Sequence, residues 1–149
     1  SAEVAGKLGV ELVSLDQLLT RADAISVHTP LNAETRGILG GGAFAKMKRG
    51  VMIVNAARGG VIDEEALKVA LDDGTVWGAA LDVFVKEPTP AGHPLVGHPR
   101  VICTPHLGAS TDEAQEKVAI EVAEQMVDYV ERGIVRNAVN AAALAEASD

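Results

Sequence analysis

Polar and charged side chains follow four short apolar runs of this sequence, at the points where strands are expected to end. His28 and Thr29 follow the first run, Arg58 the second, Asp82 the third and His106 the fourth. If the four runs are parallel strands, these residues lie on one rim of a sheet, where open α/β sheets bind their ligands. An arginine, a carboxylate and a histidine on one rim could bind an anion and exchange a proton.

Each of these side chains also has a purely structural interpretation. Arg58 could be a surface arginine, Asp82 could cap a turn, and Glu87 could be a solvated charge in a proline-rich loop. His106 differs from the other histidines because a turn of small residues, 107–110, follows it and would let a ligand approach the backbone closely. The coincidence of four strand ends, rather than any single residue, favours the functional interpretation.

Short apolar runs alternate with helical patterns along the chain, which is the order expected of βα units and a doubly wound parallel sheet. Ser14 and Asp63 are the expected N-caps of two helices, and Gly74 ends the second of them. Another helix is expected over 43–48, and 82–100 is expected to be an irregular loop. The predicted strands cover residues 24–27, 51–54, 76–81 and 101–103.

The glycine run Gly40-Gly41-Gly42 is not a phosphate-binding loop. It lacks the Lys and Ser/Thr of such a loop and does not match G-x-G-x-x-G. We interpret it as a flexible turn before the helix expected at Ala43.

The longest predicted helix runs from about Thr111 to Arg132, roughly 22 residues and 33 Å. Ser110 and Glu113 have capping-box spacing at its start. Two apolar stripes imply burial against more than one surface. One stripe comprises Ala114, Val118, Val122, Met126 and Tyr129, and the other comprises Ile120, Ala123, Val127 and Val130.

Composition limits the classes of function. The chain of 149 residues has the size of one domain, and its formal charge of −8 argues against binding nucleic acid or anionic membrane surfaces. Cys103 is the single cysteine, which excludes an intrachain disulfide and a cysteine metal site, and we expect no metal. No signal peptide or long apolar span occurs, which predicts a soluble chain and leaves its compartment open. The expected location is cytoplasmic, with an organellar stroma or matrix as the alternative.

Three longer motifs resemble the signatures of the D-2-hydroxyacid dehydrogenase family. Residues 55–63 read NAARGGVID, residues 80–84 read ALDVF and precede Glu87-Pro88, and residues 105–111 read PHLGAST. The resemblance extends from about Gly9 to Asn140, in matching order and spacing. The last motif is most similar to the phosphoglycerate dehydrogenase branch of this family.

The resemblance implies a Rossmann-like sheet that binds NAD and a role for each motif. His106 would be the acid/base, Glu87 its carboxylate partner and Arg58 the substrate clamp. Imidazole is suited to proton exchange near neutral pH, a carboxylate favours its imidazolium form, and guanidinium binds a carboxylate in a planar fork. The implied cofactor-binding residues are Thr29, Ala56, Ala57, Arg58, Asp82, His106, Leu107, Gly108 and Ala109.

The implied reaction is oxidation of 3-phosphoglycerate to 3-phosphohydroxypyruvate, in serine biosynthesis. A glyoxylate/hydroxypyruvate reductase or another D-2-hydroxyacid dehydrogenase is the first alternative. A non-catalytic interaction module with an NAD(H)-type fold is the second. The presence of Arg58, Glu87 and His106 together argues against that second alternative.

The family's G-x-G-x-x-G turn and the acidic residue that distinguishes NAD from NADP do not occur among these residues. We therefore expect the second half of an NAD-binding domain, which alone would be inactive. Residues 1–110 would contain the catalytic portion, 111–133 the long helix, and 134–149 a tail leading to a further segment. The expected partners are a small phosphorylated 2-hydroxyacid and further copies of the chain, in a homodimer or higher oligomer formed through the cofactor domain.

Overall fold

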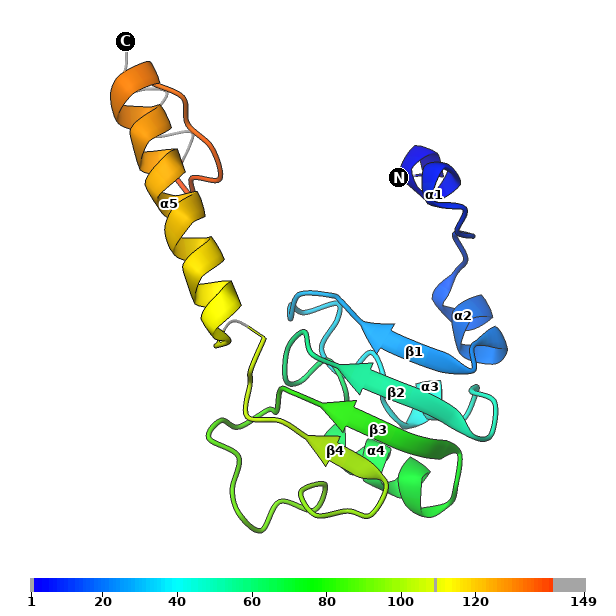
Figure 1. Ribbon diagram of the computed structural model, residues 1–149. Coiled ribbons are helices and arrows are strands. Elements are labelled where there is room, and N and C mark those ends of the chain that lie inside the picture. The colour runs from blue at the N-terminus through cyan, green and yellow to red at the C-terminus, as the bar shows by residue number, and fades with distance from the viewer. Residues whose placement is uncertain (1, 109, 141–149) are drawn as a thin grey trace. The chain divides into compact units, whose positions relative to one another are not determined.

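The computed structural model describes residues 2–108 and 110–140 (Figure 1). The chain divides into two compact units, Ser1–His106 and Leu107–Asp149, and each is described by itself. The alanine-rich end of the expected tail, residues 141–149, lies outside the described residues.

The first unit is built on a sheet of four parallel strands in the order β1-β2-β3-β4. The predicted α/β class, with a Rossmann-like parallel sheet, is therefore confirmed. Three strands have the predicted bounds, and the second continues for one residue further, to Asn55. The strands are β1 (Ala24–Val27), β2 (Val51–Asn55), β3 (Val76–Leu81) and β4 (Val101–Cys103).

The side chains of the strands alternate between a buried and an exposed face, as the pleat requires. Ile25 and Ile53 are buried on one face, where Leu67 and Leu71 of α4 (Glu64–Asp72) join the same apolar core. Figure 1 shows α3 and α4 on this side of the sheet. The opposite face presents exposed large side chains: Met52, Val54, Trp77 and Ile102.

Two of the predicted helix caps are confirmed. Ser14 and Gln17 form a reciprocal capping box at the start of α2 (Leu15–Arg21). The Asp63 side chain accepts hydrogen bonds from the backbone N–H groups of Glu65 and Ala66 at the start of α4. A further helix, α1 (Ala2–Leu8), was not predicted, because its one buried residue, Ala5, gives no apolar periodicity.

The prediction for residues 40–48 was wrong. Helix α3 spans Gly41–Phe44, so Gly41 and Gly42 form its first turn instead of a separate flexible turn. The N–H groups of Ala43 and Phe44 donate to the Gly40 carbonyl, and the buried Phe44 ring fixes this short helix to the core. No described side chain caps the helix start, so no capping residue indicated it in the sequence.

Residues 82–100 form the irregular connection predicted between β3 and β4. Leu95 is fully buried and anchors this connection in the apolar core of the first unit. The Cys103 thiol, partly buried, donates a weak hydrogen bond to the Leu95 carbonyl.

The second unit is dominated by α5 (Asp112–Arg132). Its N-cap is Thr111, whose side chain accepts from the N–H of Ala114, and not the predicted Ser110. Gly133 ends the helix in the left-handed conformation. Within the described residues, most of the large side chains of both predicted stripes are exposed, among them Val118, Ile120, Val122, Met126, Val127, Tyr129 and Val130.

One acidic side chain joins α5 to the segment that follows it. Asp128 is buried, and its carboxylate pairs with Arg132 and with Arg136.

No helix in the described part of the chain combines the length and the apolar character needed to cross a bilayer.

Candidate active site

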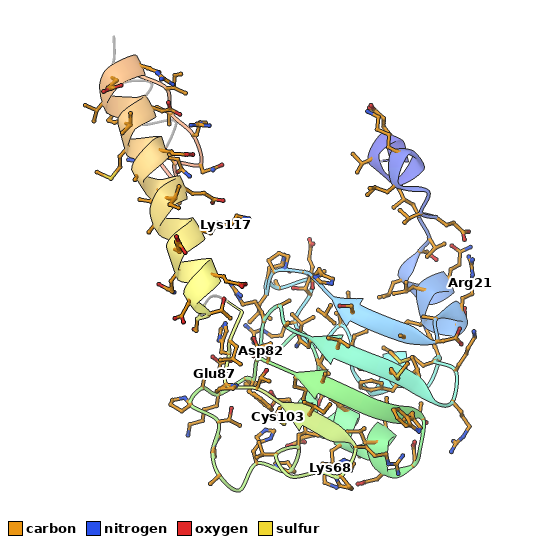
Figure 2. All side chains as sticks on the ribbon, in the orientation of Figure 1. Arg21, Lys68, Asp82, Glu87, Cys103 and Lys117 are labelled. Atoms are coloured by element: carbon orange, nitrogen blue, oxygen red, sulfur yellow. The ribbon has the colours of Figure 1, made fainter. Side chains whose placement is uncertain are left out.

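The carboxyl ends of the four strands lie along one edge of the sheet, because all of the pairings are parallel. Figure 2 shows Asp82 and Glu87 close to this edge, beyond the end of β3. The rim predicted from the sequence is thus present, and its side chains form two well-defined polar pairs.

Glu87 and His106 form the first polar pair. Their Oε2 and Nδ1 atoms are 2.7 Å apart, and the other Glu87 oxygen accepts from the Phe84 N–H at 2.9 Å. These two contacts, the histidine first, lower the pKa of Glu87 below its ordinary value of 4.5. The carboxylate is therefore ionised at neutral pH and orients the histidine ring.

The backbone of His106 contributes to this orientation. Its φ angle is 56°, in the left-handed region that side chains other than glycine seldom adopt. The His106 N–H donates to the Asp82 carbonyl at 2.9 Å, which ties the turn after β4 to the end of β3. Such backbone outliers concentrate at functional sites, where surrounding contacts hold them in place.

Asp82 and Thr104 form the second polar pair. The Thr104 hydroxyl donates to Oδ1 of Asp82 at 2.5 Å. The Asp82 N–H in turn donates to the Asn55 carbonyl at 2.9 Å. Asp82 is thereby bonded to the ends of β2 and β4, and its carboxylate has a fixed position on the rim.

A cavity of about 690 Å³ opens beside both pairs. It has the size of a small-molecule site, and most of its wall is apolar. Its lining residues are Asp82, Phe84, Glu87, Pro88, Thr89, Pro90, Ala91, Val96, Cys103, Thr104, Pro105 and His106. A ligand in this cavity would meet one imidazole and two carboxylates.

Asn55 shapes the turn that contains Arg58. Asn55 is buried, its Nδ2 donates to the Arg58 carbonyl at 3.0 Å, and its Oδ1 accepts from the Ala57 N–H at 3.1 Å. Arg58 itself is exposed, and its Nη1 donates to the Ala57 carbonyl at 2.6 Å. Arg58 follows β2 on the same rim but is not among the residues that line the cavity.

The Arg58 turn and the loop after β3 meet at Gly59. A Cβ atom added to Gly59 would lie 1.9 Å from the carbonyl oxygen of Phe84, so no larger residue fits without moving backbone. Because Phe84 also donates its N–H to Glu87, this close approach connects the position of Glu87 to the turn that presents Arg58.

The remaining predicted cofactor-binding residues occupy different parts of the chain. Thr29 and Ala56 are exposed and Ala57 half-buried, just beyond β1 and β2 on the rim. Leu107 and Gly108 belong to the second unit. Ala109 lies outside the described residues.

Asn55 and Thr104 had no predicted role, although each directly follows a predicted strand. An asparagine directly after an apolar run was the available signal for Asn55, since such an amide, once buried, needs hydrogen-bond partners. For Thr104 the sequence carried no comparable signal.

The described residues contain no group of three or more His, Cys, Asp or Glu side chains arranged to bind a metal ion.

Comparison with known proteins identifies the family. Residues 1–108 match the family described as D-isomer specific 2-hydroxyacid dehydrogenase, NAD binding domain. D-3-phosphoglycerate dehydrogenase of Bacillus subtilis (strain 168) is 51% identical over 142 residues, which cover 95% of this chain and 27% of that protein. The chain spans about a quarter of the length of the curated relatives it matches.

Solved structures show the same relationship. A glyoxylate reductase from Paecilomyes thermophila matches with a TM-score of 0.82 and 39% identity, over 94% of this chain and 42% of that one. An NAD-dependent formate dehydrogenase from Staphylococcus aureus in complex with NAD matches with a TM-score of 0.75 and 32% identity, over 86% and 39% of the two chains. The parallel sheet, the polar rim and these similarities agree, and the chain belongs to the family of NAD-binding domains of D-isomer specific 2-hydroxyacid dehydrogenases.

Proposed function

We propose that the whole protein, including any sequence beyond these 149 residues, oxidises 3-phosphoglycerate to 3-phosphohydroxypyruvate with NAD. The observation that supports this proposal most strongly is the Glu87–His106 pair, 2.7 Å apart and beside a cavity at the carboxyl edge of the sheet. The substrate follows from the name of the relatives that share about half of the sequence. We propose Arg58, Glu87 and His106 as the catalytic residues.

In the proposed reaction a secondary alcohol becomes a ketone. The hydroxyl proton passes to Nε2 of His106, while Nδ1 keeps its proton and donates it in a hydrogen bond to Glu87. The ionised carboxylate stabilises the imidazolium that forms, and the lowered pKa of Glu87 keeps it ionised. Arg58 would bind the substrate carboxylate through its planar guanidinium, which sets the alcohol carbon in place.

The residues on the rim fit NAD. Ala56 and Ala57 add little bulk beyond β2, and the Asp82 carboxylate is fixed by Thr104 at the end of β3. We propose Thr29, Ala56, Ala57 and Asp82 as residues that bind the cofactor, together with Arg58, His106 and the segment 107–109. When bound, NAD supplies the hydride acceptor of the reaction.

We also propose that the protein forms a homodimer or higher oligomer in which α5 is buried. Val118 and Val122 on one stripe, and Ile120 and Val130 on the other, are exposed within the described residues. Exposed apolar patches of this kind mark interaction surfaces.

We propose a division of the chain to match these roles. Residues 1–110 form the catalytic portion, 111–133 the interaction helix, and 134–149 a connection to further sequence.

A second candidate function is the reduction of glyoxylate or hydroxypyruvate. It is favoured by the structural similarity to a glyoxylate reductase, with a TM-score of 0.82. Both reactions would use the same acid/base pair, so they differ in the substrate and in the direction of hydride transfer.

A panel of substrates tests the proposal. The whole protein is incubated with NAD and 3-phosphoglycerate, D-glycerate or D-lactate, and in the reverse direction with NADH and hydroxypyruvate or glyoxylate, while absorbance at the NADH band is followed. We expect the largest kcat/KM with 3-phosphoglycerate. A larger kcat/KM for glyoxylate or hydroxypyruvate than for 3-phosphoglycerate would favour the second candidate, and no turnover of any of the five compounds would contradict both.

A further inference from the structure

A second glutamate–histidine pair, Glu64 and His93, contacts the loop that contains Glu87, the connection between β3 and β4. Oε2 of Glu64, the first residue of α4, lies 3.0 Å from Nε2 of His93. Both side chains are largely buried, with 17% and 15% of their surface exposed. Neither residue lines the cavity, so the proposed chemistry does not use them directly.

The hydrogen bonds fix which nitrogen of His93 carries the proton. The N–H of the buried Leu95 donates to Nδ1 of His93 at 3.3 Å, so Nδ1 is an acceptor. Nε2 therefore carries the proton and donates it to Glu64. The Phe84 ring meets the His93 ring edge to face, with the ring centres 5.3 Å apart and the ring planes at 75°. His93 thus gives Glu64 a defined orientation and packs against the loop.

The other Glu64 oxygen binds the backbone of this loop. Oε1 of Glu64 accepts from the Val85 N–H at 2.7 Å, and the preceding N–H, that of Phe84, donates to Glu87 at 2.9 Å. Two consecutive backbone N–H groups therefore bind the carboxylates of the two pairs. The carbonyl group of Phe84 contacts Gly59, in the turn that contains Arg58. The residues 84–85 have little freedom to move independently of either pair.

We propose that Glu64, oriented by His93, is a positioning residue for Glu87. It fixes the backbone at Phe84 and Val85, from which Glu87 receives one of its two hydrogen bonds, and so sets the carboxylate against His106. This inference rests on the proposed function, because it assumes that the Glu87–His106 pair performs acid/base chemistry.

The simpler interpretation is that Glu64 stabilises the helix. An acidic residue in the first turn of a helix interacts favourably with the helix dipole wherever the helix lies. Glu65 stands in the same first turn, is exposed, and its side chain makes no hydrogen bond to the loop within the described residues. Glu65→Ala is therefore the matched control, because it removes a first-turn carboxylate without touching Val85 or His93.

The test compares Glu64→Ala, Glu64→Gln and Glu65→Ala in the whole protein, with kcat, the KM for NAD and the thermal midpoint measured for each. We expect Glu64→Ala to lower kcat about 10- to 100-fold, as for other small displacements of catalytic groups, with the KM for NAD changed less than about threefold. Glu64→Gln keeps an oxygen for the Val85 N–H but turns an NH2 donor toward the Nε2–H of His93, so its kcat should lie between those of Glu64→Ala and the wild type. Glu65→Ala should leave kcat unchanged.

Combination with Glu87→Gln separates this inference from the proposed function. If Glu64 acts through Glu87, Glu64→Ala should lower kcat much less in the Glu87→Gln background than in the wild type. Equal effects in both backgrounds, or a lower thermal midpoint in Glu64→Ala with wild-type kcat, would overturn the positioning role. Wild-type kcat in Glu87→Gln alone would instead overturn the proposed function.

Discussion

Glu87 and His106 meet at 2.7 Å although 19 positions separate them in the sequence. The contact results from parallel strands, because β3 and β4 bring both residues to the same edge of the sheet. It is completed by the Phe84 N–H on the glutamate side and by the left-handed backbone on the histidine side. Contacts of the protein's own backbone therefore hold both members of the pair in place.

The first prediction concerns the pH dependence of stability. The pKa of Glu87 is lowered in the folded protein, chiefly by the hydrogen bond from His106 and next by the Phe84 N–H. A carboxylate with a lowered pKa stabilises the fold at pH values above its ordinary value of 4.5, and this stabilisation is lost as the pH falls through the folded pKa. Glu87→Gln, which has no charge, should therefore unfold at a lower temperature than the wild type at pH 7.

Thermal unfolding of both proteins between pH 7 and pH 3 checks this prediction. The difference between the two midpoints should shrink in solutions more acidic than about pH 5, where the carboxylate becomes protonated. Because Glu87→Gln also changes the partner of His106, the difference reports the Glu87–His106 pair and not Glu87 alone. A difference that remained the same at pH 3 would show that the carboxylate charge does not contribute.

The second prediction concerns Gly59. Gly59→Ala places a methyl group 1.9 Å from the Phe84 carbonyl oxygen, so the backbone of one loop must move. We expect a loss of about 3 kcal/mol in the free energy of unfolding, the upper end of the usual cost of overpacking where backbone must shift. Gly42→Ala is the control, since a methyl group there has no neighbour within 4 Å, and it should change stability by less than about 1 kcal/mol.

Urea denaturation of the two variants measures both values. Equal stabilities for Gly59→Ala and Gly42→Ala would mean that the loops at Gly59 and Phe84 do not require the close contact seen in the structure.

Much of the fold could be predicted because local signals agree with the final structure. Apolar runs bounded by polar residues located the strands, and the side-chain caps Ser14 and Asp63 located two helix starts. For the candidate catalytic pair, the spacing indicated only that His106 ends a strand and that Glu87 lies in the loop after another strand. The pairing of the two residues was expected from the resemblance to a known family.

The supporting contacts could not be predicted, because they depend on how loops fold against one another. The Glu64–His93 pair joins residues 29 positions apart, and nothing in the spacing of an acidic helix residue and a loop histidine indicates that they meet. The start of α3 at Gly41 was missed for a related reason, since its stability comes from the burial of Phe44 and not from a capping side chain.

The third prediction concerns α5. If its apolar stripes are buried between subunits, Val122→Lys should weaken the oligomer, because a charged side chain would have to be buried without a partner. Glu121→Lys introduces the same residue at the adjacent, polar position and serves as the control. Sedimentation equilibrium should show a dissociation constant at least about tenfold larger for Val122→Lys than for Glu121→Lys, which corresponds to about 1.4 kcal/mol. Identical constants would show that this stripe does not form the subunit contact.

The central claim is that His106, oriented by Glu87, exchanges the proton of the substrate alcohol. Replacement of His106 by alanine in the whole protein tests it most directly, with kcat followed by NADH absorbance and the affinity for NADH measured by calorimetry. We predict a fall in kcat of about two to four orders of magnitude, the usual contribution of a general acid or base, with little change in the affinity for NADH. A variant that kept kcat within about threefold of the wild type would contradict the account.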